Sequence, residues 1–209
     1  MSLTVKKFLA GPLGTNCYLA VNDDTKEAVI IDPAGLPERL AECVEHEGIQ
    51  LQAVLLTHAH FDHIMGIDAV ITKYGRMPVY VQQEDLRMLE DASLNMSGEY
   101  GRPYSFSEGQ GVPDGQMLSL AGFEFKVIHT PGHTPGGACF YVEAEEVLFS
   151  GDTLFQQSVG RTDFPGGNAA ELVRSVREKL FILPENTHVY PGHMGTTAIG
   201  REKEYNPFV

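Results

Sequence analysis

The sequence predicts an α/β (α+β) fold, a four-layer sandwich with two β-sheets inside and helices outside. Two observations favour it: segments of strand length occur in two groups, and segments with helical periodicity follow each group. The chain of 209 residues is 43% hydrophobic, which suffices for one substantial core, and its composition shows no abrupt change that would mark a linker. We therefore expect a single domain over residues 1–209.

Short strands open the chain. Residues 3–9, 17–21 and 27–31 have a strand-like composition and are separated by turn residues, Gly11-Pro12 and Asn22-Asp23-Asp24. Because tight turns of this kind join strands that run in opposite directions, we expect these three strands to be antiparallel neighbours.

Three later segments have apolar residues at helical spacing. The first starts at Pro37, a residue favoured at the first helical position, and stops at Gly48. The second ends at Gly75, and the third starts with the capping pair Asn168 and Glu171. Their apolar positions are Leu36, Leu40, Cys43 and Val44, then Ile67, Val70, Ile71 and Tyr74, and finally Leu172, Val173, Val176 and Leu180.

Residues 91–113 are rich in serine, glycine, tyrosine and proline and show no clear periodicity, which predicts a long loop. Long loops in compact domains often have a function, so a substrate-facing flap is one interpretation of this segment. An inert excursion is the other, and the sequence does not decide between them.

A cluster of metal-binding residue types occupies residues 57–66, directly after the apolar segment 53–56, which we interpret as a buried strand. Imidazole and carboxylate groups lose their hydration on burial, so several at one strand end need a partner, and a divalent cation is the simplest one. A polar loop that faces water is the alternative, but this spacing supplies ligands of the types that zinc takes. The four candidate ligands are His58, His60, Asp62 and His63.

Three further segments, 123–133, 146–152 and 188–193, each read as a strand that runs into a short turn and a candidate ligand. Two of the turns contain proline and glycine. Proline ends strand pairing and glycine lets the backbone turn tightly, so the ligand is held at a rigid strand end. These segments supply His133, Asp152 and His193, which complete a set of seven ligands, enough for two cations.

In chain order, this ligand set resembles that of the metallo-β-lactamase fold superfamily, and the resemblance covers most of the chain. It implies an αβ/βα sandwich with two mixed sheets flanked by helices and all ligands along one edge. It also implies two divalent metal ions, with zinc expected first, although nitrogen and oxygen donors also accept iron or manganese. The resemblance assigns His58, His60 and His133 to one ion, Asp62, His63 and His193 to the other, and Asp152 to both as a bridge.

The expected chemistry is hydrolysis, because a water held between two cations loses a proton near neutral pH and becomes a nucleophile. We expect Asp62 and Asp152 to be the catalytic carboxylates, with Asp62 also orienting the nucleophile. No obvious extra general acid stands beside the ligands in the sequence. This favours a good leaving group, such as a thiol of pKa about 8.5 that departs as thiolate.

Within the superfamily, residues 151–155 and 159–164 resemble the glyoxalase II-like hydrolases, particularly the short bacterial ones. Those relatives hydrolyse S-2-hydroxyacylglutathione, so the resemblance implies a small-molecule thioester as substrate. Arg161 stands where longer relatives carry a basic residue that contacts glutathione, and we expect it to bind substrate. An ion pair with Asp163 that braces the loop is the alternative role. Asp163 replaces a tyrosine of the longer enzymes, which leaves the preferred thiol open.

Two other classes of function stay open at this point. One is an iron-dependent oxidoreductase of the persulfide dioxygenase type, which shares the stretch 160–164 and uses one iron at positions equivalent to His58, His133 and Asp152. The other is a protein that binds metal without catalysis, but structural zinc sites close with four ligands and this set has seven. True β-lactamases of the fold usually carry a cysteine ligand or lack the adjacent aspartate and histidine of this cluster.

Composition excludes further classes. A net charge of −13 argues against nucleic acid, which needs clustered lysine and arginine. No apolar stretch approaches the roughly 20 residues needed to span a bilayer, and the N-terminus lacks the apolar region of a signal peptide. Cys17, Cys43 and Cys139 lie far apart in apolar surroundings, which predicts free thiols and, with them, a cytoplasmic location. The sequence does not predict the oligomeric state.

Overall fold

The computed structural model describes residues 2–209, and two central sheets are built from strands of separate halves of the chain. The first sheet contains, in spatial order, β1 (Leu3–Ala10), β2 (Thr15–Asn22), β3 (Glu27–Ile31), β4 (Gln50–Leu56), β5 (Val79–Gln82) and β6 (Gly109–Val112). The second contains β14 (Thr197–Ala198), β13 (His188–Pro191), β10 (Val147–Gly151), β9 (Ala138–Val142), β8 (Phe123–His129) and β7 (Met117–Leu120). A separate hairpin is formed by β11 (Leu154–Phe155) and β12 (Ser158–Val159).

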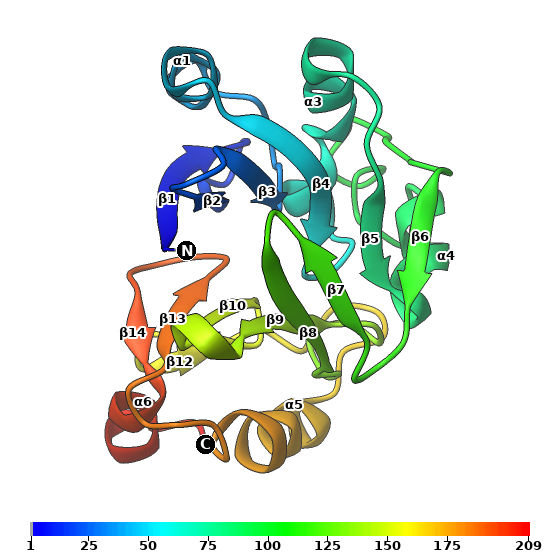
Figure 1. The fold of residues 1–209 in the computed structure, drawn as a ribbon. Coiled ribbons are helices and arrows are strands. Elements are labelled where there is room, and N and C mark those ends of the chain that lie inside the picture. Colours follow the sequence, from blue (N-terminus) through cyan, green and yellow to red (C-terminus); the bar gives the residue numbers. More distant parts are fainter. Residues whose placement is uncertain (1) are drawn as a thin grey trace.

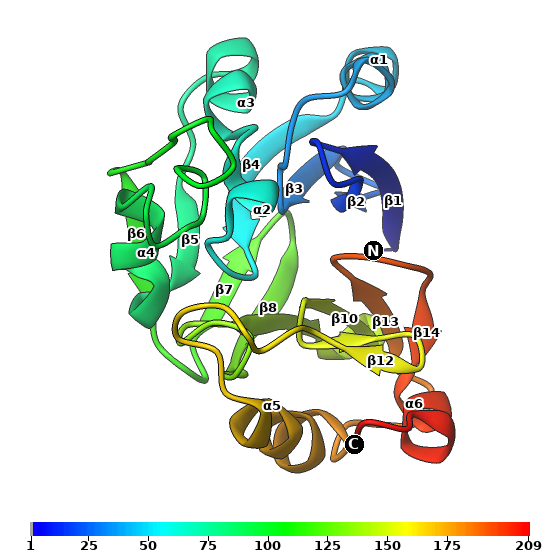
Figure 2. The same cartoon turned by 180° about the vertical axis from the view of Figure 1, so that it is seen from behind.

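Helices lie on the outer face of each sheet (Figure 1). On the side of the first sheet these are α1 (Glu38–Glu47), α3 (Ile67–Tyr74) and α4 (Leu86–Glu90), which follows a 3₁₀ turn, Gln83–Asp85. On the side of the second sheet they are α5 (Ala169–Ser175), which continues as a π-helical turn over Val176–Leu180, and α6 (Ile199–Tyr205). A 3₁₀ turn, Glu143–Glu145, separates β9 from β10. Figure 2 shows the short α2 (Phe61–Ile64) on the opposite side, at the edge between the two sheets.

Both sheets are mixed. In the first sheet, β1, β2 and β3 are antiparallel neighbours, as predicted, whereas β3 to β6 run parallel. In the second sheet, β10 and β13 are parallel and the remaining pairs are antiparallel. The predicted four-layer αβ/βα sandwich is therefore confirmed.

The side-chain alternation of β4 shows how the layers are held together. Val54 and Leu56 pack with residues of α1 and α3, while Ala53 and Leu55 pack between the two sheets. A third apolar cluster joins the outer face of the second sheet to the π-helical turn that continues α5 and to α6. Full burial of one such aliphatic side chain stabilises the fold by about 1.5–3 kcal/mol. Because successive side chains of a strand point to opposite faces, strands that are covered on both faces contribute to two apolar layers.

The predicted helix boundaries agree with the structure. Gly48 ends α1 with a φ of 66°, a left-handed conformation that glycine adopts without strain. The side chain of Asn168 accepts a hydrogen bond from the Glu171 backbone N–H at 3.2 Å, so the predicted capping pair is formed. The predicted apolar residues Leu172 in α5, and Val176 and Leu180 in its π-helical continuation, are buried.

The prediction of a loop over residues 91–113 is wrong for its last part, because residues 109–112 form β6, which pairs with β5. Two glycines give this strand a low intrinsic propensity. They are needed because α4 packs on them: a Cβ on Gly109 would lie 2.6 Å from a Leu89 methyl carbon, and one on Gly111 would lie 2.6 Å from a Leu86 methyl carbon. Pairing with β5 and packing under α4 outweigh the propensity that the sequence shows.

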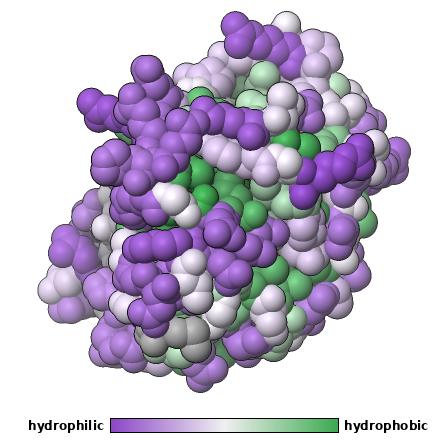
Figure 3. Space-filling view, turned by 45° about the horizontal axis from the view of Figure 1, so that its top comes forward, coloured by the Kyte–Doolittle hydropathy of each residue, from purple (hydrophilic) through white to green (hydrophobic). Residues whose placement is uncertain are grey.

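Polar residues cover most of the face in Figure 3, and hydrophobic residues gather near its centre. Over residues 2–209, no helix is long and apolar enough to cross a membrane. The predicted free thiols are also found: none of Cys17, Cys43 and Cys139 forms a disulfide. Burial raises the pKa of the Cys139 thiol to about 11.

Candidate metal centre

The ends of four strands bring the seven predicted ligands to one edge of the sandwich. β4 leads into the loop and short helix α2, β8 and β13 each lead into a turn that ends in one further candidate ligand, and Asp152 directly follows β10. Three groups of ligand atoms lie within 4.8 Å of one another: His58, His60 and His133; His58, His63 and Asp152; and Asp62, His63 and His193. The set predicted from spacing therefore converges in space.

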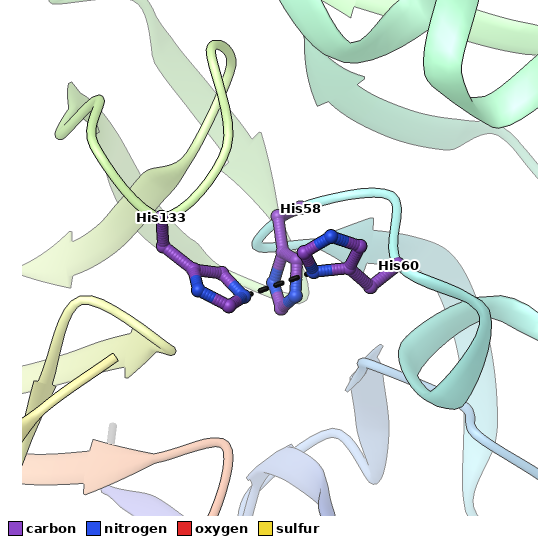
Figure 4. Close-up of side chains that lie close together, drawn as sticks. All are labelled: His58, His60 and His133. Carbon is purple, nitrogen blue, oxygen red and sulfur yellow. Dashed lines mark hydrogen bonds between the residues drawn. The ribbon is translucent and has the colours of Figure 1, made fainter. Parts of the chain in front are cut away.

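The first group consists of three imidazoles that point toward one another (Figure 4). His60 Nδ1 lies 2.9 Å from His133 Nε2, and the rings of His58 and His60 meet edge to face at 4.9 Å. All three side chains are buried. Nitrogen atoms of buried rings that approach so closely need either a shared proton or a cation between them.

Acceptors behind two of the rings fix which nitrogen carries the proton. His133 Nδ1 lies 2.7 Å from the Arg161 carbonyl oxygen, and His63 Nδ1 lies 3.0 Å from Asp32 Oδ2. A carbonyl or carboxylate oxygen only accepts, so we infer that each Nδ1 donates and that Nε2 of the neutral ring has a free lone pair. A carboxylate or carbonyl in this position is typical of histidines that bind metals.

His58 is oriented in the same way. Its Nδ1 lies 3.1 Å from Thr57 Oγ1, and this hydroxyl donates its own proton to Asp32 Oδ2 at 2.6 Å. The hydroxyl oxygen can therefore accept from His58, which again leaves Nε2 unprotonated. The buried side-chain atoms of the cluster that have no hydrogen-bond partner are His58 Nε2, His60 Nε2, His63 Nε2 and Asp152 Oδ1.

Two carboxylates lie beside these rings. Asp152 Oδ2 is 3.6 Å from both His133 Nε2 and His193 Nε2, so it stands between the two histidine groups. Asp62 Oδ2 is 3.3 Å from His193 Nε2 and accepts a hydrogen bond from the Thr15 hydroxyl, also at 3.3 Å. Buried donors with nitrogen and oxygen lone pairs and no protein partner are the set that a divalent cation satisfies, and the residues present fit such ions.

The two halves of the cluster differ in electrostatics. Burial, reinforced by the neighbouring imidazoles, lowers the pKa of His58 and of His60 well below 6.5, so both rings are neutral at pH 7. On the other side, burial would lower the pKa of His63, but the carboxylates of Asp62, Asp152 and Asp32 outweigh it and raise this pKa to about 10. The His63 proton therefore occupies a position that a cation would take.

We expect metal binding to the metal-free protein at pH 7 to release protons. The reason is the raised pKa of His63: a metal ligand must be deprotonated, so the ion displaces the proton. The affinity should rise with pH and level off above about pH 10, where the proton is already lost. Calorimetric titration in buffers of different ionisation enthalpy measures this release, and heats that do not depend on the buffer would contradict it.

Arg161 lies on the loop that contacts His133, but its guanidinium is engaged with the same loop. Its Nε and Nη2 donate to the two carboxylate oxygens of Asp163 at 2.7 and 2.6 Å, and the group stacks over Phe164 at 3.8 Å. The Phe164 ring in turn meets His60 edge to face at 5.6 Å. The ion pair with Asp163 is thus present, next to the cluster, and the predicted role in substrate binding stays a prediction.

The other histidines lie outside the cluster. His46 is exposed on α1, His188 is exposed at the start of β13, and the His129 ring contacts the Pro135 carbonyl at 2.8 Å. The segment that precedes β6 is packed against α2: the Asn95 carbonyl accepts from the Phe61 N–H at 2.9 Å, and Tyr100 stacks on Phe61. This segment therefore supports a ligand-bearing helix.

The sequence interpretation missed three residues that position the ligands. Asp32, directly after β3, accepts hydrogen bonds from Thr57 and His63. Thr15, in β2, donates to Asp62, and Asp85, after β5, accepts from the Ala59 N–H and the Thr134 hydroxyl. An aspartate that directly follows a buried strand, as Asp32 does, was the available signal. Thr15 lies in an ordinary strand sequence and gave none.

The αβ/βα sandwich thus carries a cluster of candidate metal ligands at the open edge between its two sheets, which defines the class as metal-binding proteins of this architecture. The family model for the Metallo-beta-lactamase superfamily matches residues 10–193, and the chain belongs to this superfamily.

Curated relatives and solved structures agree with this assignment. The chain is 38% identical to the probable metallo-hydrolase YqgX of Bacillus subtilis, with 98% of this chain and 96% of the relative covered. It is also 38% identical to the hydroxyacylglutathione hydrolase GloC of Haemophilus influenzae, with 93% and 92% covered.

Three solved structures share the fold over nearly the whole chain. The BLEG-1 B3 metallo-beta-lactamase superposes with a TM-score of 0.92 at 45% identity, covering 98% of this chain and 99% of that one. A di-iron-bound form of TTHA1623 superposes with a TM-score of 0.85 at 35% identity, covering 98% of this chain and 100% of that one. ETHE1 from Myxococcus xanthus superposes with a TM-score of 0.76 at 29% identity, covering 98% of this chain and 83% of that one.

Proposed function

We propose that the protein hydrolyses a small-molecule thioester of the S-2-hydroxyacylglutathione type, with two divalent cations bound by the seven-residue cluster. The observation that carries the proposal is the position of Asp152, which lies 3.6 Å from histidines of both groups and can therefore serve two ions at once. The likeness to the hydroxyacylglutathione hydrolase GloC, over 93% of this chain, supports the substrate class.

When bound, two such cations supply Lewis acidity and lower the pKa of a water molecule, which removes the need for a separate base. The chain then has to orient the reacting groups. Burial alone would raise the pKa of Asp62, but His63 and His193 lower it well below its usual range, so this carboxylate stays anionic. Held by the Thr15 hydroxyl, it is placed to accept a hydrogen bond from the attacking water.

The leaving group must depart without a strong acid from the chain. The hydroxyl groups that contact the cluster, those of Thr15 and Thr57, are too weakly acidic to protonate a leaving amine. A thiol with a pKa of about 8.5 departs as thiolate and needs no such help. This favours a thioester over an amide as substrate.

A second candidate is hydrolysis of β-lactams, which the 45% identity to the BLEG-1 B3 metallo-beta-lactamase favours. The two candidates share the nucleophile and differ in the leaving group, which is an amide nitrogen in a β-lactam. An iron-dependent oxidoreductase of the persulfide dioxygenase type, in which one iron occupies the positions of His58, His133 and Asp152, is the third outcome that an experiment has to distinguish.

The test is metal quantification coupled to three assays on protein loaded in turn with zinc, manganese or iron. We expect hydrolysis of S-lactoylglutathione that follows the metal content and exceeds the turnover of a chromogenic cephalosporin. Faster turnover of the cephalosporin would contradict the thioester and indicate a β-lactam as the substrate. Iron-dependent oxygen consumption with glutathione persulfide would contradict hydrolysis and indicate an oxidoreductase.

Arg161→Ala is expected to raise KM for S-lactoylglutathione about tenfold with kcat nearly unchanged, because a lost ground-state contact weakens binding alone. The ion pair with Asp163 is exposed and contributes little stability, so a substrate carboxylate can replace Asp163. Arg174→Ala is the matched control, since this guanidinium pairs with Glu171 at 3.3 Å on α5. Equal KM values in both variants would restrict Arg161 to bracing its loop.

A further inference from the structure

Asp85 is a fully buried carboxylate that belongs to none of the groups of candidate ligands. It ends the 3₁₀ turn that follows β5, and no lysine, arginine or histidine among residues 2–209 forms an ion pair with it. A buried charge without an ionic partner is costly unless hydrogen bonds satisfy it. Its contacts therefore indicate what the residue does.

Three donors surround the Asp85 carboxylate, and all belong to the loops that carry metal ligands. Its Oδ2 accepts from the Ala59 N–H at 3.0 Å and from the Thr134 hydroxyl at 2.9 Å. Its Oδ1 accepts from the Gly136 N–H at 2.6 Å. Ala59 stands between His58 and His60, and Thr134 directly follows His133.

The two loops come from different sheets, since one follows β4 of the first sheet and the other joins β8 to β9 of the second. One carboxylate thus connects them at the place where His60 Nδ1 and His133 Nε2 lie 2.9 Å apart. The loops also meet through a backbone bond, in which the Ala138 N–H donates to the Thr57 carbonyl at 2.8 Å. Because this second connection does not involve Asp85, we expect the sheets to stay together in a variant without the carboxylate.

The backbone of Gly136 lies so close to Asp85 that this position has no room for a side chain. A Cβ on Gly136 would lie 2.3 Å from the Asp85 backbone nitrogen and 2.7 Å from its Oδ1, distances that no side chain tolerates. Glycine at 136 therefore allows the second loop to approach Asp85 closely enough for its N–H to donate.

We propose that Asp85 is a positioning residue that joins the His58–His60 loop to the His133 loop and so fixes the three imidazoles of the first group in the geometry that a cation requires. The inference rests on the proposed metal site, but it does not depend on which substrate is hydrolysed. Groups that support metal ligands in this way typically change metal affinity or activity by about 10–100-fold when replaced.

The test is a titration of metal-free protein with Co²⁺, whose visible absorption reports ligand geometry, together with thermal unfolding and steady-state kinetics. Asp85→Asn replaces one acceptor oxygen by an amide group that faces the Gly136 N–H. Thr134→Val removes one donor and leaves the carboxylate, so it serves as the milder variant if Asp85→Asn does not fold. We expect about tenfold weaker binding of one Co²⁺ and altered absorption bands in Asp85→Asn, and smaller changes of the same kind in Thr134→Val.

Glu202→Gln is the matched control, because Glu202 is also a fully buried carboxylate. It accepts from the Gln157 N–H at 2.7 Å, from the Thr197 hydroxyl and from the Asn206 amide, none of which lies in a ligand loop. This variant should lose stability with an unchanged Co²⁺ spectrum.

Wild-type Co²⁺ affinity and absorption in Asp85→Asn would overturn the inference, as would equal spectral changes in Glu202→Gln. Wild-type protein that binds no Co²⁺ at the cluster would overturn both the inference and the proposed function. Wild-type protein that binds two Co²⁺ ions but hydrolyses no thioester would overturn the proposed function alone, because the spectra of the variants still test Asp85.

Discussion

Replacing His60 with alanine is expected to lower turnover of the metal-loaded protein by at least about a thousandfold, because a catalytic metal supplies several kcal/mol and about 1.4 kcal/mol is a factor of ten. His60 presents Nδ1 at 2.9 Å from His133 Nε2, and its removal leaves only two imidazoles in the first group. We expect the variant to retain one metal ion per chain, held by Asp62, His63 and His193.

The same variant should keep its fold. His60 belongs to none of the three apolar clusters, and its buried Nε2 has no partner, so the side chain is desolvated without a compensating bond. Metal content per chain, turnover and the unfolding temperature of the metal-free protein check these expectations. His46→Ala, at an exposed position on α1, is the control. Global unfolding of the His60 variant, or turnover close to that of the parent protein, would contradict the assignment.

The sequence was sufficient to find a set of candidate ligands that converges in space, because strand ends and ligand spacing are local properties. Four candidate ligands lie within six residues. His133 and His193 follow a strand and a short turn and Asp152 directly follows a strand, so the sandwich architecture was enough to place them at one edge. The first three strands and the helices α1, α3 and α5 were also predictable, since their periodicity and end signals are local.

What could not be predicted depends on contacts between distant parts of the chain. β6 contains two glycines, and only pairing with β5 and packing under α4 make it a strand. Asp85 and Thr15 are ordinary residues in the sequence. Asp85 contacts ligand loops of both sheets, and Thr15 in β2 contacts Asp62 in α2, which is 47 residues away in the chain. Local patterns do not contain such approaches, so the groups behind the ligands appear only in three dimensions.

Gly192→Ala is expected to lower turnover about a hundredfold while changing stability little. A Cβ at this position would lie 2.2 Å from Asp152 Oδ1 and 2.7 Å from His63 Cε1, so the Asp152 carboxylate and one ring must move. The carboxylate is the free end of a side chain and can rotate away at small cost to the fold. It then leaves the position between the two histidine groups, and a displacement of about 1 Å at a reacting centre can cost about a hundredfold in rate.

Gly195→Ala is a close control, because it adds the same methyl group three residues later. There the Cβ would meet only the Gln156 side chain, with its oxygen at 2.9 Å, and Gln156 belongs to none of the groups of candidate ligands. Metal content, turnover and unfolding temperature of the two variants distinguish the causes. If the added methyl group acted through general strain in the loop after β13, both variants would lose activity equally. If it acts through Asp152, Gly192→Ala alone loses turnover, and because the carboxylate serves both groups, it loses affinity for both ions.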